Sequence, residues 1–252
     1  MPKPLKTRLD HLLVQKGLAS NIRESSALIL AGRVRIPFIS QPLKPGILLP
    51  PDSQIFLIAS PKYVSRGGDK LEAALDFWGI SVQNLTCLDI GASTGGFTDC
   101  LLQRGASKVY TVDVGRGQLD PKIRKDSRVL ALEKTHVLKW KPDWKEGAPK
   151  FVTMDVSFMS VKNVFPWLKK NLPMPFAVLC LIKPQFEVLP QSAPRGIVKD
   201  ESAREAAIQS VLEAAQREGF ILKGRFPCPV LGAKGNREEW VLWGSDSQTE
   251  TP

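Results

Sequence analysis

The glycine-rich segment CLDIGASTGGFTDCLL, residues 87–102, constrains the fold of this chain more than any other. Its first four residues are typical of a short buried strand, and three glycines follow within residues 91–96. From Phe97 onward, apolar residues recur with the spacing of one helix face. A glycine turn between a strand and a helix lets a ligand approach bare backbone, so this segment predicts a nucleotide-like ligand.

Three ligands compete for this turn. The spacing Gly91 to Gly96 fits a P-loop, but Phe97 stands where that loop needs its phosphate-binding lysine. A dinucleotide fingerprint needs a glycine at Ser93, where a side chain blocks the pyrophosphate. S-adenosylmethionine has no phosphate and needs an acidic group for its ribose hydroxyls. Asp113, at the end of the next predicted strand, is placed for that role.

We therefore assign S-adenosylmethionine as the cofactor, bound by the turn and by acidic residues at neighbouring strand ends. The predicted cofactor-binding residues are Asp89, Gly91, Ala92, Ser93, Thr94, Gly95, Gly96, Phe97, Asp113, Val114 and Asp155. A plainer alternative stays open, in which the glycines only let the helix pack closely on the sheet.

Beyond the turn, strand patterns alternate with helical ones. This alternation predicts an α/β fold of the Rossmann-like kind, with a doubly wound, mostly parallel, seven-stranded sheet and an antiparallel finish. A helix is expected to begin after Asp200 and to end at Gly219. The predicted strands span residues 87–90, 108–113, 128–132, 151–155, 178–183, 220–226 and 238–243.

The first part of the chain has a different pattern of apolar residues. Leucines at helical spacing on either side of Gly17, followed by an alternating segment after Gly32, predict a small α+β helix-turn-helix-strand unit. A proline-rich stretch then leads to Ser60-Pro61, where we place the domain boundary. The predicted domains span residues 1–61 and 62–244, and the polar tail 245–252 is expected to be disordered.

Charge is distributed unevenly along the chain. Residues 1–66 hold ten Lys and Arg against three Asp and Glu, whereas the remainder holds 25 against 22. Such a local basic field favours a polyanionic partner, although a solvated surface alone would also explain it. The longest apolar run, residues 176–182, is far too short to span a bilayer, so we expect no membrane segment and no signal peptide. Four scattered cysteines and two histidines predict a cytoplasmic protein without a metal site.

Four residues are candidates for chemistry, three of them at the ends of predicted strands and one in a helix. Asp155 follows a strand, but the next residues lack the motifs of base-methylating enzymes. Lys183 ends an apolar strand, where burial can bring a lysine toward the pKa of a base. Glu238 begins the last strand, and Lys70 lies in a helix whose predicted N-cap is Asp69. Taken singly, each lysine also fits an ordinary surface side chain.

Seven motifs occur in an order that resembles the hemolysin A (TlyA) family, whose catalytic part is similar to the FtsJ-type ribose methyltransferases. The resemblance spans about residues 5–243, through YVSRGGDKL, LDIGASTGGFTD, VDVGRGQLD, DVSFMS, LIKPQFE, GIVKD and GNRE. It implies 2'-O-methylation of RNA, ribosomal RNA foremost, by a Lys-Asp-Lys-Glu set. The matching catalytic positions are Lys70, Asp155, Lys183 and Glu238.

The N-terminal unit resembles the RNA-binding fold of small-subunit ribosomal protein S-four, through RLDHLLVQKGLASNIRESSALILAGRV and LKPG. Where that family continues Val-x-Val-Asn-Gly, this chain has Val34-Arg35-Ile36-Pro37-Phe38. In the second part of the chain, His136 follows Thr135 after the third predicted strand, where the hemolysin A family commonly has an asparagine. The resemblance implies RNA as partner, with no DNA and no membrane. The predicted RNA contacts are Lys6, Arg8, Arg23, Arg33, Arg35 and Arg66.

Two other functions compete with this interpretation. The altered Pro37-Phe38 turn and His136 leave room for a non-catalytic RNA-binding or ribosome-assembly factor that keeps the fold. The family name also points to a pore-forming activity. The sequence argues against a pore, because the helix expected after Asp200 is explained by packing on the sheet.

Overall fold

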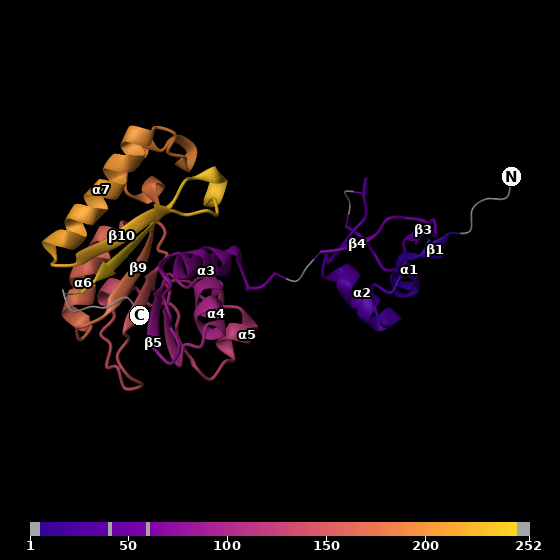
Figure 1. Ribbon diagram of the computed structural model, residues 1–252, viewed down its shortest axis with the longest axis horizontal. Coiled ribbons are helices and arrows are strands. Elements are labelled where there is room, and N and C mark those ends of the chain that lie inside the picture. The colour runs from indigo at the N-terminus through magenta and orange to yellow at the C-terminus, as the bar shows by residue number, and fades with distance from the viewer. Residues whose placement is uncertain (1–5, 40–41, 59–60, 246–252) are drawn as a thin grey trace. The chain divides into compact units, whose positions relative to one another are not determined.

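The computed structural model describes residues 6–39, 42–58 and 61–245. The chain divides into two compact units, residues 1–61 and 62–252 (Figure 1), and each is described by itself. Apart from Ser245, the predicted C-terminal tail lies outside the described residues.

The first unit packs two short helices and two small ladders around a leucine-rich core. Ladder β1–β3 and ladder β2–β4 are both antiparallel. Leu9, Leu12 and Leu13 are buried together with Ile29 and Val34. The elements are β1 (Thr7–Arg8), α1 (Leu9–Gln15), α2 (Ile22–Leu30), β2 (Val34–Arg35), β3 (Leu48–Leu49) and β4 (Phe56–Leu57).

The second unit is built on one seven-stranded sheet with the order β10-β11-β9-β8-β5-β6-β7. Strands β9, β8, β5, β6 and β7 are parallel, and β11 and β10 pair antiparallel at one edge. The predicted Rossmann-like α/β fold is therefore confirmed. The strands are β5 (Thr86–Ile90), β6 (Lys108–Val112), β7 (Val129–Leu132), β8 (Phe151–Met154), β9 (Ala177–Ile182), β10 (Ile221–Pro227) and β11 (Glu239–Gly244).

Helices cover both faces of this sheet (Figure 1). One apolar core lies beneath α3, α4 and α5, and the other lies beneath α6 and α7. None of the helices in the part of the chain that the structure describes is long and apolar enough to cross a membrane. The helices are α3 (Arg66–Trp78), α4 (Gly96–Gln103), α5 (Pro121–Arg124), α6 (Val164–Asn171) and α7 (Glu201–Arg217).

Helix α7 begins as predicted, but the predicted start of α3 is wrong. The Asp200 side chain accepts a hydrogen bond from the Ser202 amide at 2.9 Å and so caps α7. Helix α3 begins at Arg66, so Asp69 is not its cap. Gly68 lies within the helix, and a Cβ there would lie 2.1 Å from the Tyr63 ring. Packing against Tyr63 therefore demands a glycine that, in the sequence, is typical of a loop.

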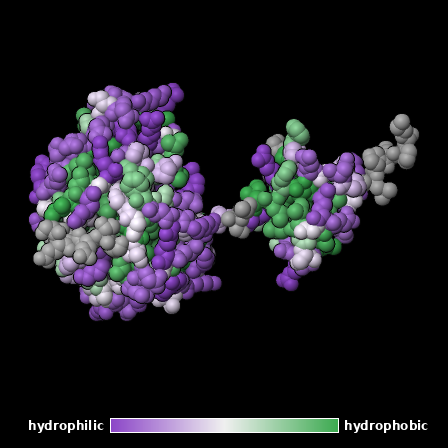
Figure 2. Space-filling model, viewed as in Figure 1, coloured by the Kyte–Doolittle hydropathy of each residue, from purple (hydrophilic) through white to green (hydrophobic). Residues whose placement is uncertain are grey.

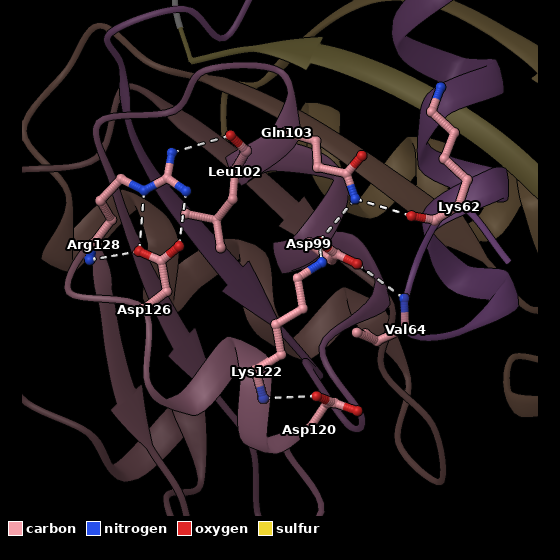
Figure 3. Close-up of polar contacts among 9 residues, drawn as sticks. All are labelled: Lys62, Val64, Asp99, Leu102, Gln103, Asp120, Lys122, Asp126 and Arg128. Carbon is pink, nitrogen blue, oxygen red and sulfur yellow. Dashed lines mark hydrogen bonds and ion pairs between the residues drawn. The ribbon is translucent and has the colours of Figure 1, made fainter. Parts of the chain in front are cut away.

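Residues that precede α3 are held against α4. The Val64 amide donates to Asp99 at 2.9 Å, and Gln103 donates to the Lys62 carbonyl at 3.0 Å (Figure 3). Asp99 is 2% exposed and also pairs with Lys122 at 3.3 Å. These contacts fix the start of α3 beside the start of α4, at the carboxyl edge of the sheet.

Close backbone approaches explain two glycines of the turn between β5 and α4. A Cβ on Gly91 would lie 2.6 Å from the Asp155 carbonyl oxygen. A Cβ on Gly96 would lie 2.9 Å from the Gly68 amide nitrogen. Packing is thus one reason for these glycines, whether or not a ligand also uses the turn.

Replacing Gly91 with alanine tests this constraint against a matched glycine. Gly91 and Gly79 both have positive φ, at +86° and +65°, but a Cβ on Gly79 would meet nothing within 4 Å. We expect Gly79→Ala to lower the free energy of unfolding by about 1 kcal/mol, through backbone strain alone. Gly91→Ala should lose about 3 kcal/mol, because a clash adds to the strain. Urea unfolding of both variants measures this, and equal losses would refute the packing argument.

Candidate active site

The carboxyl ends of β5, β6 and β8 surround a cavity of about 300 Å³. The cavity lies where the order of the strands reverses, because β6 and β8 pair with opposite sides of β5. Ligands bind at such switch points in open α/β sheets. The polar lining residues include Ser93, Asp113, Gln118, Thr135, His136, Asp155 and Ser157.

A second cavity, of about 230 Å³, lies between the start of α3 and the glycine turn. Lys70 and Arg66 line it from α3. Gly91, Ser93 and Asp155 line both cavities, so the two spaces share a wall at the end of β8. The remaining residues of the second cavity are Ser65, Gly67, Ala92, Thr94, Gly96 and Phe97.

Nine of the eleven predicted cofactor-binding residues line one or both cavities, and Asp89 and Gly95 line neither. The Asp89 carboxylate lies beneath the turn, where it accepts hydrogen bonds from Thr98 at 2.6 Å and Thr153 at 3.0 Å. It therefore ties α4 to β8 instead of facing the cavity. At Gly95, φ is +92° and Leu119 would crowd a Cβ at 2.8 Å.

Burial raises the pKa of Asp89 to about 7, although both threonine hydroxyls oppose the shift. The carboxylates of Asp155 and Asp113 raise it further. The side chain is fully buried, so its charged form lacks hydration.

Asp113 organises the glycine turn from the end of β6. Its carboxylate accepts hydrogen bonds from the Ser93 amide at 2.8 Å and from the Gly115 amide at 2.7 Å. The side chain is half-buried and lines the larger cavity. It is thus anchored by backbone donors while one side faces the space that a ligand would fill.

The four predicted catalytic residues form two ion pairs. Lys70 Nζ lies 2.5 Å from Glu238 Oε2, and both side chains are buried. Lys183 Nζ lies 2.6 Å from Asp155 Oδ1 and donates to the Ser157 hydroxyl at 3.0 Å. Asp155 and Lys70 line the same smaller cavity. The structure therefore brings two cations and two anions to one edge of the sheet.

Alternation along β11 separates Glu238 from its neighbour Glu239. Glu239 opposes Ile182 in the β9–β11 ladder, so Glu238 follows on toward Lys183. Glu239 instead lies 2.9 Å from Arg204 of α7, and burial raises its pKa. Because successive strand residues point to opposite faces, only Glu238 reaches Lys70.

Two buried residues that hold the site were missed by the sequence analysis. Asn236, 3% exposed, donates to the Gly196 carbonyl at 2.8 Å and accepts from the Val198 amide at 3.1 Å. It thereby ties the loop that carries Glu238 to a neighbouring loop. Glu187 accepts from Ser160 at 2.5 Å, next to the loop after β8. Their one sequence signal is that both stand inside motifs, GNRE and LIKPQFE, with a candidate residue.

The predicted RNA-contacting residues fall into two groups. Arg66 lines the smaller cavity, whereas the others belong to the first unit. Arg8 pairs with Asp10 at 2.6 Å, and Arg33 donates to the Ile58 carbonyl at 2.7 Å. The exposed members of the first unit are Lys6, Arg8, Arg23 and Arg35.

His136 lines the larger cavity, and its Nδ1 accepts a hydrogen bond from the Leu138 amide at 3.3 Å. All four cysteines are free and buried. Within residues 6–39, 42–58 and 61–245, no cluster of His, Cys, Asp or Glu is arranged to hold a metal ion.

An open sheet of this order, with a glycine turn and an acidic residue at its switch point, is a Rossmann-like arrangement of the kind that binds nucleotide-like ligands. A family model described as FtsJ-like methyltransferase matches residues 63–245. The chain belongs to this FtsJ-like family and, within it, to the hemolysin A (TlyA) group.

Relatives within that group cover nearly the whole chain. "Hemolysin A" of Brachyspira hyodysenteriae is 39% identical, covering 92% of this chain and 97% of the relative. "16S/23S rRNA (cytidine-2'-O)-methyltransferase TlyA" of Mycobacterium tuberculosis is 38% identical, covering 94% of this chain and 89% of the relative. A solved structure, "Putative hemolysin from Streptococcus thermophilus", superposes with a TM-score of 0.73 at 38% identity and covers 97% of this chain and 90% of that one.

Asp89→Asn tests the buried carboxyl through the pH dependence of stability. The pKa of Asp89 rises from an ordinary 3.8 to about 7 on folding. Its stabilising contribution is complete below about pH 4 and is lost as pH rises through 7. Relative to Asp89→Asn, the wild type should therefore lose up to about 4 kcal/mol between pH 4 and pH 8. Urea unfolding at both pH values measures the difference, and a pH-independent difference would contradict the raised pKa.

Proposed function

We propose that this protein transfers a methyl group from S-adenosylmethionine to a ribose 2'-hydroxyl of ribosomal RNA. The observation that carries the proposal is the position of Asp155, which lines both cavities and pairs with Lys183. A residue at that shared wall would meet a cofactor on one side and a ribose on the other.

The residues of the larger cavity fit the proposed cofactor. The cavity has a volume of about 300 Å³. Apolar side chains and several polar groups line it, as is usual for small-molecule sites. Asp113 would hold the ribose hydroxyls, and the turn from Gly91 would lie against the methionine part. S-adenosylmethionine, when bound, supplies a methyl group activated by its sulfonium.

The two ion pairs would divide the remaining work. Lys183, once it has released a proton to solvent and is a neutral amine, would take the proton of the attacking hydroxyl, and Asp155, 2.6 Å away, would orient that amine. Lys70 would stabilise the developing oxyanion or a neighbouring phosphate, held in place by Glu238. Fixing these groups before the reaction removes much of the entropic cost of alignment.

RNA as the acceptor is supported by charge and by relatives. The first unit is basic, which favours a polyanion, and we propose that residues 1–61 form an S-four-like RNA-binding domain that precedes a methyltransferase domain at 62–244 in the sequence. The relative from Mycobacterium tuberculosis is named as an enzyme of 16S and 23S rRNA. We place the reaction in the cytoplasm, where bacterial ribosomes are assembled.

Methyl transfer from labelled S-adenosylmethionine to ribosomal subunits and to naked ribosomal RNA, followed by nucleoside mass spectrometry, tests the proposal. We expect the wild type to form a 2'-O-methylnucleoside. Lys183→Ala should lower the rate at least about 100-fold, because the proton acceptor is removed.

The matched control is Lys145→Ala. Lys145 is 81% exposed and precedes β8, at the opposite edge of the sheet. The Lys145→Ala variant should methylate ribosomal RNA at the rate of the wild type. A methylated base would refute the ribose acceptor, and cofactor binding without any transfer would favour the non-catalytic RNA-binding factor.

Asp113→Ala tests the proposed cofactor contact separately. Hydrogen bonds to a charged group are worth about 1.5–3 kcal/mol, so the Kd for S-adenosylmethionine should rise about 10- to 100-fold. Asp113→Asn keeps one acceptor oxygen and should lose less. Isothermal titration calorimetry measures the Kd of both variants. The control is Asp143→Ala, because the side chain of Asp143 is 64% exposed and the residue precedes β8. Unchanged affinity in Asp113→Ala would remove Asp113 from the cofactor site.

A further inference from the structure

The turn that follows β2 presents an aromatic ring to solvent from a strained backbone position. The Ile39 amide donates to the Ile36 carbonyl at 3.3 Å, which closes a four-residue turn. Pro37 and Phe38 occupy its two central positions, and φ of Phe38 is +66°. A turn with proline first and a positive φ second requires glycine or asparagine at the second position. Phenylalanine there costs stability, and its ring is fully exposed, so no packing compensates the cost.

The neighbouring β2–β4 ladder adds a second aromatic ring beside a cation. Arg35 opposes Phe56 in the ladder, so the two side chains share one face. Both are exposed, and Phe56 retains 52% of its surface. Within the described residues, the Arg35 side chain makes no hydrogen bond or ion pair. The adjacent Val34 is buried, which fixes the opposite face of the ladder to the core.

Apolar surface gathers on this unit, and Figure 2 shows it among hydrophilic residues. The same unit carries eight Lys and Arg against three Asp and Glu in residues 1–61. Exposed aromatic rings within a positive field match single-stranded nucleic acid, since bases stack on rings while phosphates meet cations. A protein partner of similar apolar character would gain nothing from the excess of positive charge. The exposed large apolar residues of this unit are Ile22, Leu30, Phe38, Leu48, Phe56, Leu57 and Ile58.

We propose that Phe38, with Phe56 and Arg35, forms a platform that stacks an unpaired base of the RNA substrate. The proposal rests on the proposed function and names the part of the RNA that the first unit recognises, a loop or bulge instead of a continuous duplex. Unstacked bases are available only in such regions, because duplex bases are already stacked on one another.

The full-length protein is titrated, at one fixed salt concentration, into a fluorescein-labelled hairpin RNA with an unpaired loop and into a duplex of the same stem. Phe38→Gly should weaken binding to the hairpin about tenfold and leave duplex binding unchanged. Phe38→Trp should retain hairpin binding, because it keeps a stacking ring. Arg35→Ala should instead reduce the salt dependence of binding, since it removes a phosphate contact.

Thermal unfolding separates this role from a structural one. Glycine relieves the positive φ, so Phe38→Gly should unfold at no lower temperature than the wild type while it binds the hairpin more weakly. Leu48→Ala, at an exposed position of the other ladder, is the control and should change neither property. A lower unfolding temperature with unchanged hairpin binding would show that the ring packs within the chain and would overturn the platform.

Methylation of ribosomal subunits by the wild type, run in parallel, keeps the two proposals apart. If the wild type methylates subunits but Phe38→Gly binds the hairpin as tightly, the platform alone is overturned. Equal wild-type affinity for hairpin and duplex would also overturn it. If the wild type neither binds nor methylates RNA, the proposed function itself fails, and the platform fails with it.

Discussion

The buried contact between Lys70 and Glu238 joins residues 168 positions apart in the sequence, and the arrangement of the site depends on it. It links the first helix of the second unit to the entrance of its last strand. A buried ion pair adds little net stability, but the loss of one partner leaves a costly unpaired charge. The pair therefore acts mainly by excluding folded arrangements in which only one of the two charges is buried. The chain cannot bury one of these residues without bringing the other to the same edge of the sheet.

Further buried hydrogen bonds hold the segments that carry the two partners of this pair. Asp99 holds the segment before α3, and Asn236 holds the loop before β11, so each partner is supported by a buried polar residue. Asp89 does the same for the glycine turn by joining α4 to β8. Such fully bonded buried groups rigidify a site, whereas partly bonded ones would destabilise it. The residues that we propose as catalytic are therefore held by buried polar contacts from three elements.

Local sequence patterns predicted the sheet, because its strands are short apolar runs whose ends fall at turn residues. The same patterns failed where tertiary contacts decide. Gly68 is typical of a loop, yet it lies inside α3, where the contact with Tyr63 leaves no room for a side chain. Asp89 stands next to the turn in sequence, but the side of the strand on which it lies directs it into the core. Asn236 had no signal of its own, since its partners are carbonyl and amide groups of another loop.

The glycines and the charged residues of the site therefore differ in what they imply about function. Gly91 and Gly96 have a sufficient reason in packing, so their presence alone is weak support for a ligand. Lys183 has no such reason, because a cation at the end of a strand of six buried residues opposes the burial that forms the strand. Phe38 conflicts with its turn in the same way. Where a residue contradicts both its local preference and the packing around it, folding does not explain it, and function is the remaining physical explanation.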